Sequence, residues 1–301
     1  MGLDLKAFKF ILGEMADGLD LRRTVTLGRQ SVVVCPPKQL HRALRHAGIN
    51  AEIPRVDALV APGYADLLLK YLGDTQLAAR GEAGDTQVDS IDKSDFEGAS
   101  IRHDMNEPVP DALRGRFTAV IDGGTLEHVF NVPVAFRNCM EMLDRGGRFI
   151  SFTISNGASG HGFYQFSPEL FFRVFSGANG FEVRRLLLQE AGGRWYEVLD
   201  PAETGRRAEF PSALYTSLFV SAERCELRLL LREMPQQSDY SAKWASGGAA
   251  GPLSRGKGLV PFLYNGGLGH WLRTTLKFVL TYFRPDGRSF RRTVLYCRRT
   301  R

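Results

Sequence analysis

Apolar positions recur along the chain with two different spacings. The helical spacing of three to four residues predicts helices, and short β-rich runs between these segments predict strands. Helical spacing appears over residues 3–16, 37–47 and 64–72. A further helix is expected from Ser167, with Pro168 in its first turn, to a stop near Gly180. Short runs rich in β-branched and aromatic residues predict strands at 24–28, 88–92, 100–104, 117–122, 148–154, 181–188 and 217–231. The alternation predicts an α/β fold built on a doubly wound, mostly parallel sheet.

The most informative run is residues 117–122, which is apolar until Asp122 and is followed by Gly123 and Gly124. Such a run is typical of a buried parallel strand that opens into a loop at its carboxyl end. A helix, a Gly-Gly turn at 146–147 and the strand at 148–154 complete one right-handed βαβ unit. Open α/β sheets bind ligands at carboxyl strand ends, so we expect chemistry between Asp122 and His128.

Composition adds a charge asymmetry to this picture. The 301 residues carry a formal net charge of +6. Residues 255–301 contain eleven Lys or Arg and one acid, so this segment carries +10 and the remainder −4. A basic, aromatic-rich helix within 268–283 would lie on an anionic membrane surface, cover the body or form a dimer contact. Nucleic acid is a weaker interpretation, because the arginines do not interleave with aromatics.

The chain divides by composition into three parts. Residues 1–233 form the predicted α/β domain, with a helical insertion at 28–88. Residues 234–258 are rich in Gln, Ser, Gly and Ala, which predicts a linker or mobile loop. Residues 259–301 form a basic amphipathic C-terminal extension. The four cysteines show no metal or disulfide spacing, and no signal peptide or membrane span is evident, so we expect a cytoplasmic protein, with peripheral membrane contact as an addition.

Three predicted strand ends carry an acid or a glycine and together suggest a nucleotide-type pocket. Gly28 would let backbone approach a ligand closely, Asp92 could hold a ribose diol, and Asp104 could accept from an exocyclic amine. Each signal is weak alone, because a glycine after a strand is usually a turn residue and such an aspartate is as often a helix cap.

In this order the motifs resemble those of the class I S-adenosylmethionine-dependent methyltransferases. Ser90-Ile-Asp-Lys-Ser94 resembles their strand-two acid motif and His103-Asp104 their acid after strand three. Residues 117–129 resemble the strand-four motif in its Leu-Glu-His-Val variant, and 143–147 the turn before strand five. Residues 166–170 and 179–181 resemble the later helix and strand six. The resemblance covers about residues 20–230 and implies a Rossmann-like methyltransferase fold.

The chain departs from that pattern in two places. The glycine-rich loop is reduced to Thr26-Leu-Gly28-Arg-Gln30, and 64 positions separate Gly28 from Asp92, which implies inserted helices. Only twelve positions separate Asp92 from Asp104, too few for a full crossover helix. Either a short loop around 95–98 replaces that helix, or the third strand is misplaced.

The resemblance implies S-adenosylmethionine as cofactor and assigns roles to five residues. Gly28 would approach the methionine moiety, Asp92 the ribose hydroxyls and Asp104 the adenine amine, while Asp122 and Gly123 would lie beside the sulfonium. The chemistry would be an in-line displacement that needs mainly alignment and exclusion of water.

Catalytic candidates follow the strands at 117–122 and 148–154. Glu127 and His128 come just after the first, and His161 and Tyr164 after the second. A histidine near neutral pKa can take a proton from a hydroxyl acceptor, and we expect His128 and His161 to face the transferred methyl group from opposite sides. Alternatively, the histidines only cap backbone or lie in a loop.

A metal site from Glu127, His128 and His161 is chemically conceivable, but the prediction is that no metal is held. The Glu-x-x-Glu-His arrangement of some metal-dependent RNA methyltransferases has Gly124 here in place of its first Glu. The sequence thus predicts methyl transfer to a small-molecule, lipid or saccharide acceptor. The alternatives are an inactive binding or scaffold protein of the same fold and an RNA methyltransferase.

Overall fold

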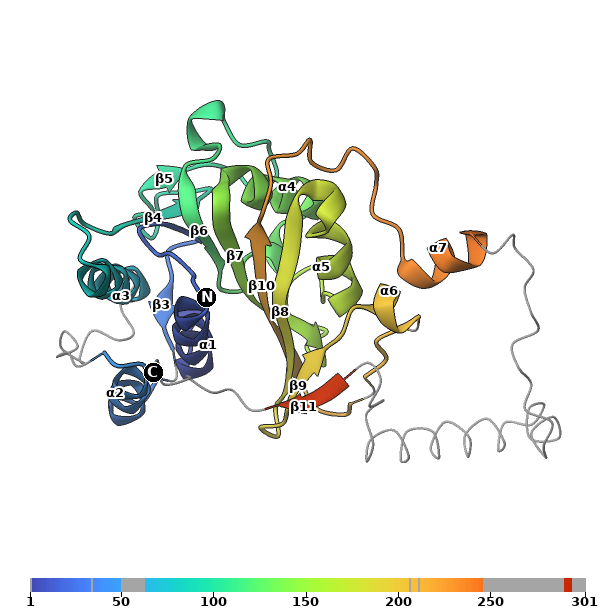
Figure 1. Ribbon diagram of the computed structural model, residues 1–301, viewed down its shortest axis with the longest axis horizontal. Helices are drawn as coiled ribbons and strands as arrows, with labels where there is room; N and C mark the ends of the chain where they lie inside the picture. Colours follow the sequence, from blue (N-terminus) through green and yellow to red (C-terminus); the bar gives the residue numbers. More distant parts are fainter. Residues whose placement is uncertain are drawn as a thin grey trace.

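The computed structural model describes residues 2–33, 35–49, 63–205, 207–210, 212–245 and 290–293. Its centre is a nine-stranded sheet in the order β11-β9-β8-β10-β7-β6-β2-β4-β5 (Figure 1). The strands are β2 (Arg23–Leu27), β4 (Gln87–Asp92), β5 (Ile101–Arg102), β6 (Phe117–Asp122), β7 (Leu143–Asn156), β8 (Phe181–Glu190), β9 (Trp195–Val198), β10 (Thr216–Arg224) and β11 (Phe290–Thr293). A small parallel sheet pairs β1 (Gly2–Leu3) with β3 (Ser31–Val32).

The strand order confirms the doubly wound α/β fold. Strands β5, β4, β2, β6 and β7 are parallel neighbours, and numbered along the chain they give the order 3-2-1-4-5. The order reverses between β2 and β6, which is where such sheets bind ligands. Beyond β7 the sheet is antiparallel, because β10 lies between β7 and β8 and pairs antiparallel with both.

Helices cover both faces of the sheet (Figure 1). They are α1 (Leu5–Ala16), α2 (Pro37–His46), α3 (Tyr64–Arg80), α4 (Val132–Met142), α5 (Pro168–Val174), α6 (Pro201–Thr204) and α7 (Ser238–Ala245), with short 3-10 turns η2 (Asp111–Leu113), η3 (Leu126–His128) and η4 (Gly177–Asn179). One buried cluster lies under α1, α2 and α3, and a second under α4 and α5. Strand β6 contributes side chains to both clusters, which explains its near-continuous apolar run.

The predicted helix from Ser167 ends earlier than expected. Helix α5 stops at Val174, and η4 follows as a separate turn before Gly180. The buried Asn179 amide donates to the Val174 carbonyl oxygen at 2.8 Å, so a side chain satisfies the helix end. Ser167 occupies the N-cap position, but its side chain makes no capping hydrogen bond.

Several strand predictions also need correction. Strand β10 ends at Arg224 rather than near residue 231, and the four-residue strands β9 and β11 were not expected. The short-loop alternative between Asp92 and Asp104 is confirmed: residues 93–100 connect β4 to β5 without a helix, and β5 pairs through two residues only.

Within the described part of segment 28–88 lie the helices α2 and α3. Within the predicted linker 234–258, however, residues 238–245 form helix α7. Of the C-terminal extension the structure describes β11, whose Phe290 is buried against Tyr196 and Phe210. The basic helix expected within 268–283 lies outside the described residues. Among the described helices, none is both long and apolar enough to cross a bilayer.

Candidate active site

Three strand ends meet at the point where the sheet order reverses. Gly28 follows β2 with φ of +71°, a conformation that favours glycine. A Cβ added there would lie 3.4 Å from Thr125 Oγ1, in the loop after β6, and 3.8 Å from Asp92 Oδ2, at the end of β4. The fold therefore brings Gly28 and Asp92 together, although 64 positions separate them in the chain.

The Asp92 carboxylate has one oxygen directed toward this meeting point. Its Oδ1 accepts a hydrogen bond from the Ser94 N–H at 3.0 Å, and its Oδ2 faces Gly28. Among the described residues, no lysine or arginine forms an ion pair with Asp92. The half-buried carboxylate thus offers an acceptor oxygen to a ligand beside Gly28.

Asp104 follows β5 and is already engaged by its neighbours. It accepts from the Asn106 N–H at 3.0 Å and Nδ2 at 2.7 Å, and it pairs with Lys93 at 2.9 Å. The backbone hydrogen bond from Asn106, and then the bond from Lys93, lower the pKa of Asp104 to about 2. A ligand amine would have to share these oxygens with the existing partners.

Asp122 is a structural residue rather than an open ligand contact. Its side chain is fully buried, Oδ1 accepts from the Thr125 N–H at 2.8 Å, and Oδ2 accepts from Ser151 Oγ at 2.7 Å. Burial raises the pKa of this carboxyl. A side-chain contact from Asp122 to a sulfonium is therefore not supported. Gly123 in the same turn lines a pocket, and an added Cβ there would lie 2.5 Å from Gln30 Oε1, so Gln30 packs closely against it.

A pocket of about 240 Å³ opens beside this turn and is called the strand-end pocket below. Its walls are the N-terminal segment, the loop after β6, the carboxyl end of β7 and the start of β10. Gly123, Glu127, Thr153 and His161 line it. It thus adjoins the Gly28–Asp92 meeting point through the loop after β6.

Glu127 forms a buried wall of the strand-end pocket. Its side chain is 1% exposed, and its Oε2 accepts a hydrogen bond from Thr153 Oγ1 at 3.0 Å. Burial, followed by the nearby Asp122 carboxylate, raises the pKa of Glu127 to about 8. A perturbed carboxyl in a pocket wall is a feature of functional sites.

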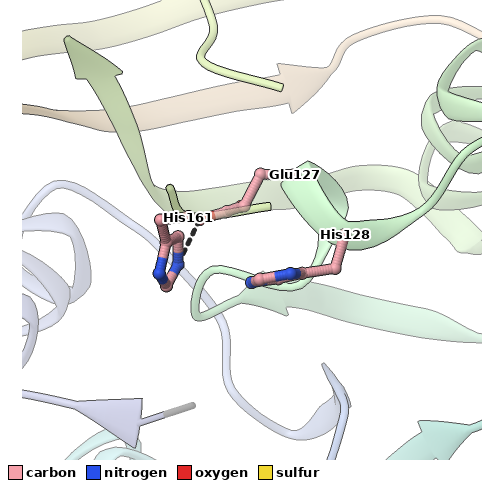
Figure 2. Close-up of side chains that lie close together, drawn as sticks. All are labelled: Glu127, His128 and His161. Carbon is pink, nitrogen blue, oxygen red and sulfur yellow. Dashed lines mark ion pairs between the residues drawn. The ribbon is translucent and has the colours of Figure 1, made fainter. Parts of the chain in front are cut away.

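His128 and His161 lie together rather than on opposite sides of an acceptor, so that expectation is wrong (Figure 2). Their ring centroids are 4.8 Å apart in an edge-to-face arrangement, and His161 Nε2 lies 3.9 Å from Glu127 Oε1. The cause is the loop after β7, which folds back onto η3: the Phe163 and Tyr164 N–H groups both donate to the Glu127 carbonyl oxygen. Burial and the neighbouring His161 lower the pKa of His128.

Tyr164 connects the loop after β7 to the segment after η3. Its hydroxyl donates to the Phe130 carbonyl oxygen at 2.8 Å, and its ring stacks on Phe166. The predicted catalytic role for Tyr164 would require its hydroxyl to leave that partner.

Two polar residues near Gly28 were missed from the sequence. Gln30 is fully buried, and its Oε1 has no partner among the described residues. Asp66 of α3 lies near Arg29, and burial raises its pKa to about 6. Gln30 is the last residue of the reduced glycine loop, and this position was an available signal. Asp66 gave no signal in the sequence, because its position beside Arg29 depends on how the inserted helix α3 packs.

No protein-family model matches this chain, and no curated protein sequence matches it. Solved structures with some likeness include a candidate methyltransferase from Bacillus halodurans, with 11% identity, a TM-score of 0.36 and coverage of 72% of this chain and 99% of that one. A trans-methyltransferase in complex with SAH has 12% identity and a TM-score of 0.36, and the match covers 73% of this chain and 55% of that one. A branched-chain polyamine synthase from Thermus thermophilus, bound to 5'-methylthioadenosine and N4-aminopropylspermidine, has 12% identity and a TM-score of 0.33, and the match covers 78% of this chain and 60% of that one. The chain spans less than two thirds of these last two. Such scores carry no functional argument, and the Rossmann-like α/β fold rests on the sheet order.

Proposed function

We propose that this protein binds S-adenosylmethionine at the carboxyl ends of β2 and β4 and transfers its methyl group to an acceptor in the strand-end pocket. The observation that carries the proposal is the placement of Gly28, with φ of +71°, beside the open oxygen of Asp92 at the reversal of the sheet order. Dinucleotide- and nucleotide-binding sheets use a glycine and an acid at this place for the same physical reasons.

The residues present fit such a cofactor. Gly28 leaves room for close approach, Asp92 would accept from the ribose hydroxyls, and Gly123 would border the methionine end. Bound there, the sulfonium would supply an electrophilic methyl group. The protein's own contribution would be to orient the acceptor and to exclude water from the pocket.

The strand-end pocket favours a small acceptor or the small reactive end of a larger one. Its volume of about 240 Å³ is below the usual range for a drug-sized ligand. Phe130 and Phe163, each two positions after His128 and His161, are exposed, and their rings contact each other edge to face at 5.8 Å. This exposed apolar pair supports an acceptor that carries an apolar group outside the reacting part, such as a small-molecule or lipid-linked substrate.

The test is calorimetric titration of the protein with S-adenosylmethionine and S-adenosylhomocysteine, for the parent chain and for Asp92→Ala. Loss of two hydrogen bonds to a carboxylate costs roughly 2–4 kcal/mol, so we expect affinity to fall by about 30- to 1000-fold. Asp95→Ala, three positions away in the same loop, is the matched control and should bind like the parent.

Equal binding by folded Asp92→Ala would remove the ribose assignment, and no binding of either compound by the parent would remove the proposal. Tight binding without methyl transfer to any acceptor in a broad panel would favour the alternative of a binding or scaffold protein.

A further inference from the structure

Two residues that line the strand-end pocket, Glu127 and His161, lie beside His128, and all three are potential metal ligands. One carboxylate oxygen of Glu127 and one ring nitrogen each of His128 and His161 all lie within 4.8 Å of one another. Figure 2 shows the three side chains gathered between η3 and the loop after β7. We infer that these three residues form a binding site for a divalent transition-metal ion.

The backbone holds the two contributing loops in place. Glu127 and His128 are consecutive in η3, and the Phe163 N–H donates to the Glu127 carbonyl oxygen at 2.7 Å. Gly162 has φ of +69°, and a Cβ there would lie 2.7 Å from the same oxygen, so only glycine permits this close approach. The backbone of the loop after β7 therefore places His161 next to Glu127.

The donor spacing suits a shared ion after a small adjustment. Ligands at about 2.0–2.2 Å from one ion lie within about 4 Å of each other. Both imidazoles are exposed and can rotate toward Glu127, whose Oε2 is held by Thr153 at 3.0 Å. A hydrogen bond to the ligating carboxylate is the usual support for a metal site.

The local charge also favours a cation. Glu127 and Asp122 are both buried, at 1% and 0% exposed, and lie close enough to interact. No lysine or arginine in the described part of the chain pairs with either carboxylate. A divalent ion would supply the missing positive charge.

The ligand set indicates which ions would bind. Two imidazoles and one carboxylate suit Zn²⁺, Mn²⁺, Fe²⁺ or Co²⁺, whereas Mg²⁺ and Ca²⁺ prefer oxygen ligands alone. Three protein ligands leave coordination positions open, as in catalytic rather than structural sites, and two of the ligands, Glu127 and His161, line the strand-end pocket. With the proposed function, these positions would take the oxygen of a hydroxyl-bearing acceptor. The ion would lower the pKa of this hydroxyl, so that its proton would pass to solvent while the oxygen takes the methyl group and S-adenosylhomocysteine leaves.

The metal assignment itself is tested without cofactor or acceptor. Tag-free full chain, treated with a chelator, is titrated with Zn²⁺ in equilibrium dialysis, and its melting temperature is measured with and without the ion. We expect one tight site per chain and a raised melting temperature, because the ion binds the folded state. His128→Ala and His161→Ala should each weaken binding at least about 100-fold, since even outer-shell partners cost 10- to 100-fold.

His46→Ala, at the end of α2, is the matched control and should keep the site. Cys225→Ser tests the partly exposed thiol as an accidental ligand. Stoichiometric binding that survives both His128→Ala and His161→Ala, or that is lost only in Cys225→Ser, would overturn the assignment, as would no binding by the folded parent. These outcomes leave S-adenosylmethionine binding untouched, so the two proposals can fail separately.

Discussion

Asp122 and Glu127 lie five positions apart in one turn but have different environments. The Asp122 side chain is buried and accepts hydrogen bonds from Thr125 and Ser151, whereas Glu127 lines the strand-end pocket. The sequence predicts chemistry in this segment. It could not distinguish the two carboxyls, because which one faces inward depends on the path of η3 and on Ser151 from the next strand.

Asp66 gives a prediction at the same scale. Burial raises its pKa to about 6 in the folded state, while an unfolded chain titrates near 4. The folded state therefore binds the extra proton between about pH 4 and 6, and stability falls as pH rises through this window. Asp66→Asn removes the titration, so its stability relative to the parent should rise by about 1–3 kcal/mol between pH 4 and pH 7.

Urea unfolding of both proteins at several pH values measures this effect. Asp111→Asn, at an exposed position, gives the background. A stability difference that stays constant from pH 4 to pH 7 would show that Asp66 does not carry the predicted penalty.

At the scale of elements, a buried arginine forms ion pairs and hydrogen bonds that connect α1 to the sheet. Arg148 of β7 is 5% exposed and contacts Glu14 of α1 at 3.2 Å and Glu223 of β10 at 3.1 Å. It also donates to the Asp17 carbonyl oxygen at 2.7 Å, at the end of α1. This anchor positions the helix whose N-terminal turn borders the strand-end pocket.

Arg148→Met removes one of the two arginines that pair with the buried Glu14, the other being Arg185, so we expect the free energy of unfolding to fall by about 1–3 kcal/mol. Arg184→Met removes an exposed pair to Glu223 and should cost less than about 1 kcal/mol. Chemical denaturation of the two variants compares them directly, and equal losses would contradict the anchoring role of Arg148.

Elements with a strong local pattern were predictable, and those set by distant pairing were not. The stripe of α1 and the apolar run of β6 each reflect burial on a known period, and both were found as expected. By contrast, the four-residue strand β11 forms by pairing with β9 across a long stretch of chain. Strand β9 pairs with its chain neighbour β8 as well, but its four residues are too few to show a clear period. The early end of α5 likewise depends on the Asn179 side chain rather than on a helix-breaking residue.

Over the whole molecule, the candidate site is assembled from segments that the sheet order brings together. Gly28, Asp92 and the loop after β6 could be placed at one sheet edge from the order of motifs. The contact between His128 and His161 could not, because it depends on the loop after β7 folding back onto η3. The role of the basic segment 255–301 at an anionic surface stays a prediction from its charge.

The central claim is that S-adenosylmethionine binds where the sheet order reverses. A crystal structure of the full chain with S-adenosylhomocysteine, at a concentration well above its dissociation constant, tests this most directly. The account predicts the ribose within hydrogen-bonding distance of Asp92, the backbone of Gly28 against the ligand, and the sulfur directed toward the strand-end pocket. An ordered ligand bound away from Gly28 and Asp92, or a structure at that concentration in which this place holds no ligand, would contradict it.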